Sequence, residues 1–515
     1  MKQNWPGMGG KLIQAAFFIW CLILCGTAAA QTITQPIRKE LEIDAFKETV
    51  EVIPIQDSTL LLYRRPYFDL FKSKHVFQKF DQNLKQQWET TLELDNDEEF
   101  HQYYATAGFV YLMFLERNPG RFHILKINAR NGEHVYTKYN LKDFDIDRDV
   151  QFDKFKVLNN QVFIMAYNSR NVLVIHLNQE TGQIKTIPAL YDQLSAISDF
   201  HLDTTAQRAE FVLAESNGIK GRLQVKRFSP HGDLYTTNFI IPPFKRNLIT
   251  GQVSPGDSTS KIVIGSFNSR SLRTAEGIFS TPLAAPENSA IYHPFTKLKH
   301  FYDFLGKGAR RRLTQKAARY EEKNKEIRQG FRLLIQDLEV YRDTLYLFAE
   351  AYTPVSHNSN RYLNRITSYP MGMLNLPPRE RDMSPSEFRF SHSFVLAFDK
   401  KGNLLWDNNY VLEDASTTTL APVAQHAFAG DKIVMAYAYE KDIRYKIINR
   451  DSTSDNEASV PLEALNTNEK LSDPDEPDLK FWYGSNFITF GFQRVRSGNW
   501  QSREVFYLTK VSLAP

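Results

Sequence analysis

Short apolar runs, rich in β-branched and aromatic residues, recur along the chain between polar turns. Runs of this length and composition are typical of β-strands. The most regular series begins at Leu60, Val110, Val162, Phe211, Ile262, Leu345, Ile433 and Phe487. The steps between these runs are 50, 52, 49, 51, 83, 88 and 54 residues. Five of the seven steps match one period of about fifty residues, and the two long steps indicate insertions rather than missing repeats.

A polar turn with a glycine recurs at the same period. Its clearest copy runs from Phe398 to Trp406, where Gly402 supplies the positive φ angle of a tight hairpin. The corresponding glycines of three other copies are Gly132, Gly182 and Gly232. Each period reads as four strands with no long helical pattern between them. The sequence therefore predicts an all-β fold, a β-propeller of about eight, alternatively seven, four-stranded blades with a helical insertion.

The two ends of the chain suggest how such a ring closes. The last repeat offers three strands between residues 480 and 511, and Ile33 to Ile43 could supply its missing outer strand. Pairing of the two ends would leave no open seam in the ring. Seven blades would result if the first and last runs contributed to one shared blade.

The hairpin turn also resembles a known repeat. Ala397-Phe398-Asp399, followed by Gly402 and Trp406, is similar to the repeat of pyrroloquinoline-quinone-type (quinoprotein-like) propellers. In that family an Asp-containing turn with glycine precedes a tryptophan. The resemblance covers the turn in some five repeats, and the tryptophan is present in two of them, at Trp88 and Trp406. It implies the fold class alone, and because no ligand set for a quinone can be matched, no cofactor is expected.

The first thirty residues have the features of a secretory signal. Lys2 and Lys11 precede or border an apolar run from Ala15 to Leu24, and Ala28 to Ala30 form a small-residue cleavage site. We expect cleavage after Ala30, which leaves residues 31–515 as a single propeller domain in the periplasm or outside the cell. No later segment is apolar enough to span a membrane.

The composition of this mature chain excludes several functions. Both cysteines, Cys21 and Cys25, lie within the signal, so no thiolate metal site or cysteine nucleophile is expected, and no other metal site is predicted. Loss of Lys2 and Lys11 lowers the basic count from 63 to 61, against 59 acidic residues. So small an excess argues against nucleic acid as a partner.

Two insertions are the predicted binding features. The first, 294–330, has a helical pattern and is basic, with twelve Lys and Arg against four acids between Lys297 and Arg332. It is either a solvated amphipathic helix or a site for an anionic partner, with Arg310, Arg311 and Arg312 as contacts. The second, 353–390, is a long loop whose candidate contacts are Tyr362, Arg365 and Tyr369. Blade topology places both insertions on one face, where we expect them to cap the channel.

No catalytic motif is present, so the catalytic residues stay unassigned. Asp337, Glu339 and Asp343 lie near inner strands and could line the channel. The sequence favours an exported, non-catalytic binding or scaffold protein of the cell envelope, with a protein or anionic glycan as partner. The alternative is a carbohydrate-active hydrolase or lyase with carboxylates at the channel mouth.

Overall fold

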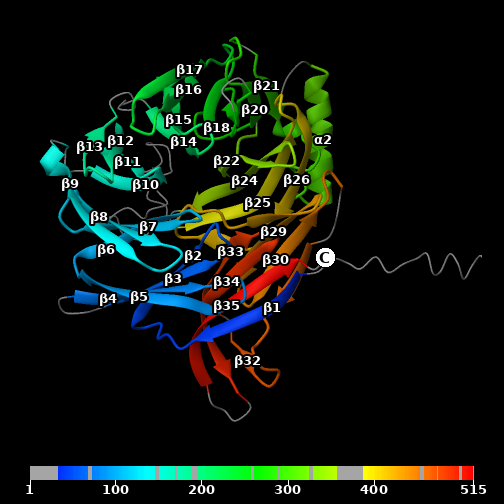
Figure 1. Ribbon diagram of the computed structural model, residues 1–515. Helices are drawn as coiled ribbons and strands as arrows, with labels where there is room; N and C mark the ends of the chain where they lie inside the picture. The colour runs from blue at the N-terminus through cyan, green and yellow to red at the C-terminus, as the bar shows by residue number, and fades with distance from the viewer. Residues whose placement is uncertain are drawn as a thin grey trace, which may run out of the picture.

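The computed structural model describes residues 33–513, apart from 68–71, 145, 147–149, 169–170, 188–194, 257–259, 288, 324–326, 328, 356–386, 453–456, 473 and 498–501. These residues form eight antiparallel sheets, each made largely of four strands in sequence order. Figure 1 shows the sheets as blades around a ring, with the colour running once around it until blue β1 meets red β35. The predicted eight-bladed β-propeller is confirmed, and the seven-bladed alternative is excluded because the first and last runs lie in separate sheets.

The blades are numbered here in chain order. Blade 1 is β2 (Glu48–Pro54), β3 (Leu60–Pro66), β4 (Lys72–Phe80) and β5 (Gln86–Asp95). Blade 2 is β6 (Glu98–Ala105), β7 (Phe109–Glu116), β8 (Arg121–Asn128) and β9 (His134–Asn140), followed by the short helix η1 (Leu141–Phe144). Blade 3 is β10 (Val150–Leu158), β11 (Gln161–Asn168), β12 (Asn171–Asn178) and β13 (Ile184–Thr186). Blade 4 is β14 (Ser195–Asp203), β15 (Arg208–Ser216), β16 (Gly221–Phe228) and β17 (Leu234–Ile240).

The second half of the ring carries the additions to this plan. Blade 5 is β18 (Asn247–Val253), β19 (Ile262–Asn268), β20 (Gly277–Pro282) and β21 (Ile291–Pro294). Blade 6 is β22 (Arg332–Ile335) with β23 (Glu339–Tyr341), β24 (Thr344–Val355), β25 (Glu387–Phe398), β26 (Leu404–Val411) and β27 (Ser416–Thr417). Blade 7 is β28 (Gln425–Ala429), β29 (Lys432–Tyr439), β30 (Asp442–Ile448) and β31 (Glu457–Pro461). Blade 8 is β33 (Asp475–Tyr483) with the short β32 (Lys470–Leu471), β34 (Asn486–Arg496), β35 (Ser502–Leu513) and β1 (Ile33–Leu41).

The repeat seen in the sequence is the repeat of the blades. Each of the eight apolar runs falls in the second strand of a blade, from β3 to β34. The hairpin glycines have the expected left-handed backbone, with φ of 77° at Gly132, 71° at Gly182, 80° at Gly232 and 84° at Gly402. Two features require glycine at position 132. Its backbone is left-handed, and a Cβ atom there would lie only 2.9 Å from Trp88 of the neighbouring blade.

Hydrophobic clusters fill the boundaries between neighbouring blades. Between blades 1 and 2 the cluster includes Tyr63 and Phe114, and between blades 8 and 1 it includes Leu62 and Leu508. All eight boundaries hold such a cluster among the described residues. The aromatic content of the chain is therefore used mainly to pack blade against blade.

The predicted closure is confirmed. Strand β1 pairs antiparallel with β35, in a register that runs from Ile33 opposite Leu513 to Leu41 opposite Phe506. The N-terminal strand thereby becomes the outer strand of the last blade. Both ends of the ring are tied into one sheet, so the ring has no open edge at this point.

The first insertion follows β21 and contains η3 (Phe295–Lys297) and α2 (Lys307–Glu321). The helical pattern expected from Phe301 onward is wrong before Lys307. Residues 301–305 form turns instead, because Phe301 is buried in the aromatic cluster between blades 5 and 6. Asp407 fixes the chain just before it, accepting hydrogen bonds from the backbone N–H of Lys299 and of His300 at 2.9 and 2.7 Å.

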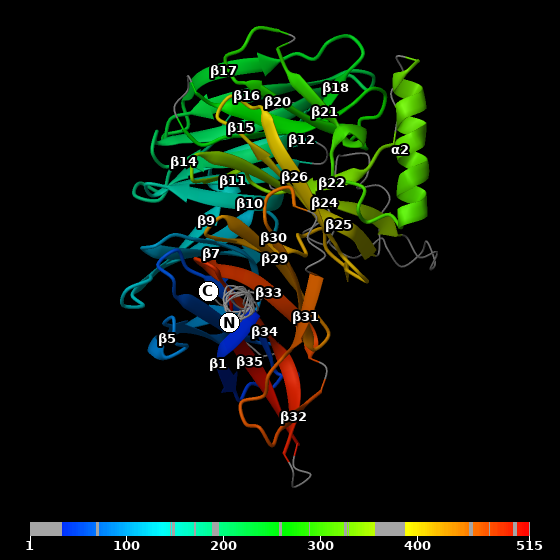
Figure 2. The ribbon, with the colours of Figure 1, turned by 90° about the vertical axis from the view of Figure 1, so that its right-hand side faces the viewer.

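The position of α2 corrects the expected cap. In Figure 1 the helix stands at the outer edge of the ring near β21 and β26, and Figure 2 again shows it at the edge of the molecule. It therefore does not cover the centre of the ring.

The second insertion is shorter than predicted, because β24 continues to Val355 and pairs there with Glu387 of β25. Its remainder, with Tyr362, Arg365 and Tyr369, lies outside the described residues.

Candidate functional site

Ionisable side chains on the first strands of several blades face the centre of the ring. The clearest indication is an ion pair between Lys156 of β10 and Asp337, which lies between β22 and β23, at 3.5 Å. These residues belong to blades 3 and 6, with two whole blades between them. The pair therefore crosses the space enclosed by the inner strands, and we call this space the channel.

The channel is open to solvent around this pair. The Asp337 side chain keeps 66% of its surface exposed and Lys156 keeps 21%. Asp199 and His201, two residues apart on β14, lie close enough to Asp337 to interact with it electrostatically. Lys156 also donates a hydrogen bond to the carbonyl of Phe200 at 2.6 Å, which holds its ammonium group beside this strand.

The pKa values of Asp199 and Asp337 are shifted in opposite directions. Burial, followed by the nearby Asp337 charge, raises the pKa of Asp199 to about 7, although the N–H of Val253 donates to its Oδ2 at 3.1 Å. The surrounding channel wall partly desolvates Asp337 although its side chain touches solvent, but Lys156, Lys154 and His201 outweigh this effect and hold the pKa of Asp337 below its usual value. Asp199 thus titrates near neutral pH, where Asp337 is already ionised.

The substitution Asp199→Asn tests this assignment. A carboxyl whose pKa is higher in the folded state stabilises the fold fully below its unfolded pKa, and loses that contribution as the pH rises through the folded pKa. Wild-type stability should therefore fall, relative to the variant, by up to about 4 kcal/mol between roughly pH 4 and pH 8. Thermal unfolding across this range measures the difference. The matched control Asp414→Asn removes an exposed carboxyl with φ of 55° and should leave the profile unchanged. Parallel profiles of wild type and Asp199→Asn would contradict the raised pKa.

A second charged group lines the channel on the side of blades 8, 1 and 2. Lys480 of β33 donates to Glu51 Oε1 at 2.7 Å and to the carbonyl of Val52 at 2.9 Å. Its ammonium also lies 5.5 Å from the centre of the Tyr103 ring. Burial opposes the charged form of Lys480, but Tyr103, Glu51 and Asp478 outweigh it and raise its pKa. The channel wall thus carries ammonium and carboxylate groups on both sides.

The acids expected near the channel have three different positions. Asp337 lies in the channel. Glu339 lies 2.9 Å from His426 Nε2 at the boundary of blades 6 and 7. Asp343 is not in the channel, because it sits in the exposed β23–β24 turn with φ of 64° and pairs with Lys400 at 2.6 Å.

Sequence reasoning missed Lys154, Lys156, Asp199 and His201. The signal that could have found them is an alternation of charged residues on one face of the first strand in blades 3 and 4. The basic residues singled out on α2 are not near the channel pair. Arg310 is ion-paired with Asp303, whereas Arg311 and Arg312 are exposed and have no acidic partner among the described residues.

Blade 2 contains a buried polar network that could be mistaken for a metal site. Ligand atoms of Glu98, Glu116 and His123 lie within 4.8 Å of one another. His123 lies 3.0 Å from Glu98 and 2.8 Å from Glu116, so its ring bridges the two carboxylates. Lys138 donates to Glu98 at 2.8 Å and Arg121 pairs with Glu116 at 3.3 Å. Burial raises the pKa of Glu98, but its hydrogen bonds from His123 and Lys138 outweigh this and lower it to about 2. Because protein cations already neutralise both carboxylates, the network serves to tie the strands of blade 2 together.

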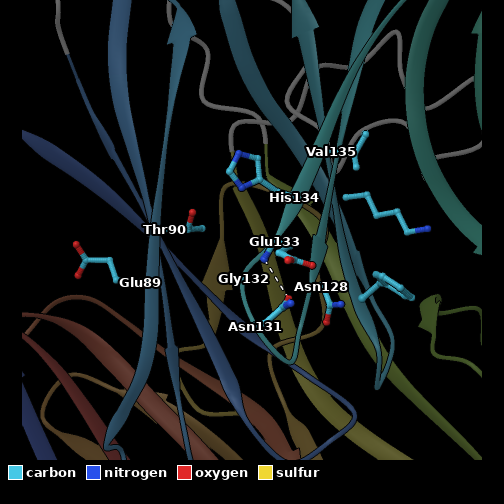
Figure 3. Close-up of a pocket in the computed structure, with 10 residues that line it drawn as sticks. Glu89, Thr90, Asn128, Asn131, Gly132, Glu133, His134 and Val135 are labelled. Carbon is cyan, nitrogen blue, oxygen red and sulfur yellow. Dashed lines mark hydrogen bonds between the residues drawn. The ribbon is translucent and has the colours of Figure 1, made fainter.

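A cavity of ≈ 770 Å³ lies beside the β8–β9 turn, and Figure 3 shows the residues that line it. Its lining residues are Glu89, Thr90, Phe109, Lys126, Asn128, Asn131, Gly132, Glu133, His134 and Val135. The Lys126 ammonium in its wall already bonds Asn160 Oδ1 at 2.8 Å and lies 4.3 Å from the centre of the Phe109 ring. The cavity is a groove beside the β8–β9 turn, which joins the third and fourth strands of blade 2 and so lies on the face opposite the insertions.

No protein-family model matches the chain, and no curated protein matches it. Among solved structures, prolyl oligopeptidase B from Galerina marginata is 8% identical with a TM-score of 0.40, over 88% of this chain and 56% of that one. The polysaccharide lyase Uly1 is 8% identical with a TM-score of 0.36, over 81% of this chain and 90% of that one. Kluyveromyces lactis Hsv2 is 10% identical with a TM-score of 0.35, over 81% of this chain and 100% of that one.

These likenesses carry no inference about activity. The chain spans about half the length of a prolyl endopeptidase that it also matches, at 8% identity. The fold is established by the eight sheets of this chain itself. Within the part of the chain that the structure describes, no helix has both the length and the apolar character needed to cross a bilayer.

Proposed function

We propose that this chain is an exported, non-catalytic binding or scaffold protein of the cell envelope, and that its ligand enters the polar channel. The observation that carries the proposal is the Lys156–Asp337 pair, which lies across an open channel with Asp199 and His201 beside it. A wall with both ammonium and carboxylate groups suits a hydroxylated or charged ligand, and an acidic glycan fits the lysines of blade 3.

Export is supported by the sequence and agrees with the closure of the ring. The features of a signal end at Ala30, and β1, which closes the ring, begins at Ile33. Removal of the signal would therefore leave every described strand in place. The mature protein in a cell-envelope fraction should begin at Gln31.

Equilibrium binding to an acidic oligosaccharide, such as oligoglucuronate, tests the ligand site. The variant Lys154→Met/Lys156→Met should bind about tenfold or more weakly, because each lysine can make a charge-assisted hydrogen bond to a carboxylate. The control Lys142→Met removes an exposed lysine of η1, away from the channel, and should bind as wild type does. Thermal melting of each variant separates loss of binding from loss of folding. Equal binding by wild type and both variants would show that the channel is not the oligosaccharide-binding site.

A second candidate function rests on the split pKa values of Asp199 and Asp337. A glycoside hydrolase uses one carboxyl with a raised pKa as acid and one ionised carboxylate as base, and Asp199 and Asp337, which interact electrostatically, would take these two roles. The same oligosaccharide distinguishes the two functions. A binding protein releases it intact, whereas a hydrolase produces reducing ends or, as a lyase, unsaturated ends, and Asp199→Asn would stop this reaction.

A further inference from the structure

Apolar and basic side chains gather on one face of blades 4, 5 and 6. In a propeller the loops that join the second strand to the third, and the fourth strand to the next blade, share one face. Four such connections meet here, namely residues 217–220, 241–246, 269–276 and the described part of 295–331, which leaves out 324–326 and 328. We call the surface that they form the basic arc.

Two loop tips of the basic arc present large apolar side chains to solvent. Phe244 is 86% exposed and Ile219 is 76% exposed. The loops touch, because the Lys220 ammonium donates to the carbonyl of Phe244 and lies 4.3 Å from the centre of its ring. Phe239 and Ile241 beside them are also exposed, at 48% and 37%. Neighbouring exposed apolar residues at protruding tips differ from the isolated ones found on most soluble proteins.

The contact continues along the face toward α2. Leu272 of the third connection packs so closely on Gly221 that a Cβ there would lie 2.9 Å from Leu272 Cδ2. Ala275 and Phe331 exchange backbone hydrogen bonds of 2.7 and 2.9 Å, which join the third connection to the end of the first insertion. Leu313 of α2 packs on the same aromatic cluster as Phe331. The arc is therefore one continuous surface and not a set of separate loops.

The charge of the arc is strongly basic. Helix α2 carries six basic residues and one acidic residue, and none of its residues is buried. Arg310 is held by Asp303 and by the carbonyl of Lys299, whereas Arg311 and Arg312 are exposed and have no acidic partner among the described residues. The exposed side chains of Lys245, Arg270 and Arg273 add to the charge between α2 and the apolar tips.

We infer that the basic arc docks on an anionic phospholipid bilayer. Exposed arginines and lysines attract the phosphate-rich surface, and Phe244 and Ile219 then insert among the lipid head groups. The apolar tips favour a bilayer over a hydrated polyanion, because a soluble glycan offers no apolar layer for a phenyl ring. This inference does not depend on the channel, since none of the arc residues lines it.

Cosedimentation of the mature protein with lipid vesicles tests the inference. Wild type should bind vesicles of phosphatidylcholine with about one third phosphatidylglycerol, should not bind pure phosphatidylcholine, and should release in high salt. Arg311→Glu/Arg312→Glu should weaken binding about tenfold or more, since each basic residue near an anionic surface contributes several-fold to affinity. Phe244→Ser/Ile219→Ser should also weaken it several-fold, with less effect on its salt dependence.

Matched substitutions on the opposite face are the controls. Arg130→Glu changes an exposed arginine in the β8–β9 turn, and Leu405→Ser changes a leucine of β26 that is 54% exposed. Both should bind vesicles as wild type does. The inference is overturned if wild type fails to bind anionic vesicles, or if the controls lose binding as much as the arc variants. It is also overturned if Phe244→Ser/Ile219→Ser binds normally while soluble heparin competes fully, because the site would then recognise a polyanion.

Discussion

Removing residues 31–45 should lower the melting temperature of the propeller by about 10 °C or more and make it prone to aggregate. The deletion removes β1, which pairs with β35 along its whole length and buries Ile33 between blades 7 and 8. Arg38 is lost as well, and its guanidinium bonds Gln493 at 2.9 Å and lies 4.7 Å from the centre of the Tyr507 ring. The loss of a buried isoleucine, a strand ladder and this contact together costs about 5 kcal/mol or more.

Thermal unfolding and size-exclusion chromatography measure this effect. The control is the mature protein, which lacks only residues 1–30 and keeps β1. A synthetic peptide of residues 31–45, added in excess, should restore much of the melting temperature, because binding to the folded ring stabilises it by mass action. A deletion variant that melts within about 2 °C of the control would show that the closure strand contributes little.

Lys261→Met should destabilise the protein by about 3 to 5 kcal/mol, the usual cost of leaving buried charges without their partner. Lys261 lies just before β19 and is 1% exposed, and its ammonium bonds Asp203 at 3.0 Å and Glu210 at 2.8 Å. It also donates to the carbonyl of Ser254 at 3.2 Å. Without the lysine, two carboxylates would remain side by side between blades 4 and 5.

The effect should depend on pH in a defined direction. Burial raises the pKa of Glu210 even with Lys261 present, because the lysine only partly opposes it. In the variant Glu210 is therefore free to take up a proton, and the defect should shrink as the pH falls toward about 5. Denaturant unfolding at several pH values measures it. The triple variant Lys261→Met/Asp203→Asn/Glu210→Gln should recover most of the stability. A single variant as stable as wild type at neutral pH would contradict the role given to the lysine.

Much of the fold was predictable because its signals are local. The hairpin at Gly402 needs only a residue that tolerates positive φ, and each second strand needs only a short apolar run such as the one at Val162. The closing strand from Ile33 was predictable because the last repeat lacks a strand. The helix in the first insertion was predicted too early in the chain, because Phe301 and Phe304 have helical spacing but are held in turns by the neighbouring blades.

The candidate site was less predictable. Asp337 was singled out, but its partner Lys156 lies 181 positions away in the sequence, with two whole blades between them in the ring. Arg310 differs from Arg311 and Arg312 because it is ion-paired with Asp303, and the position of Asp303 follows from the turns that precede α2. Neither ion pair produces a repeating pattern that could be recognised in the sequence.

The sequence by itself determined the repeat, its strands and turns and the strand that closes the ring, because each depends on residues a few positions apart or on a count of strands. Only the tertiary structure decided which side chains share the channel, which cations of α2 have an acidic partner among the described residues, and which loop tips lie on the same face as α2. The physical reason is that closure of the ring brings together side chains from blades far apart in the chain. Their charges then shift one another's pKa values only at those short distances.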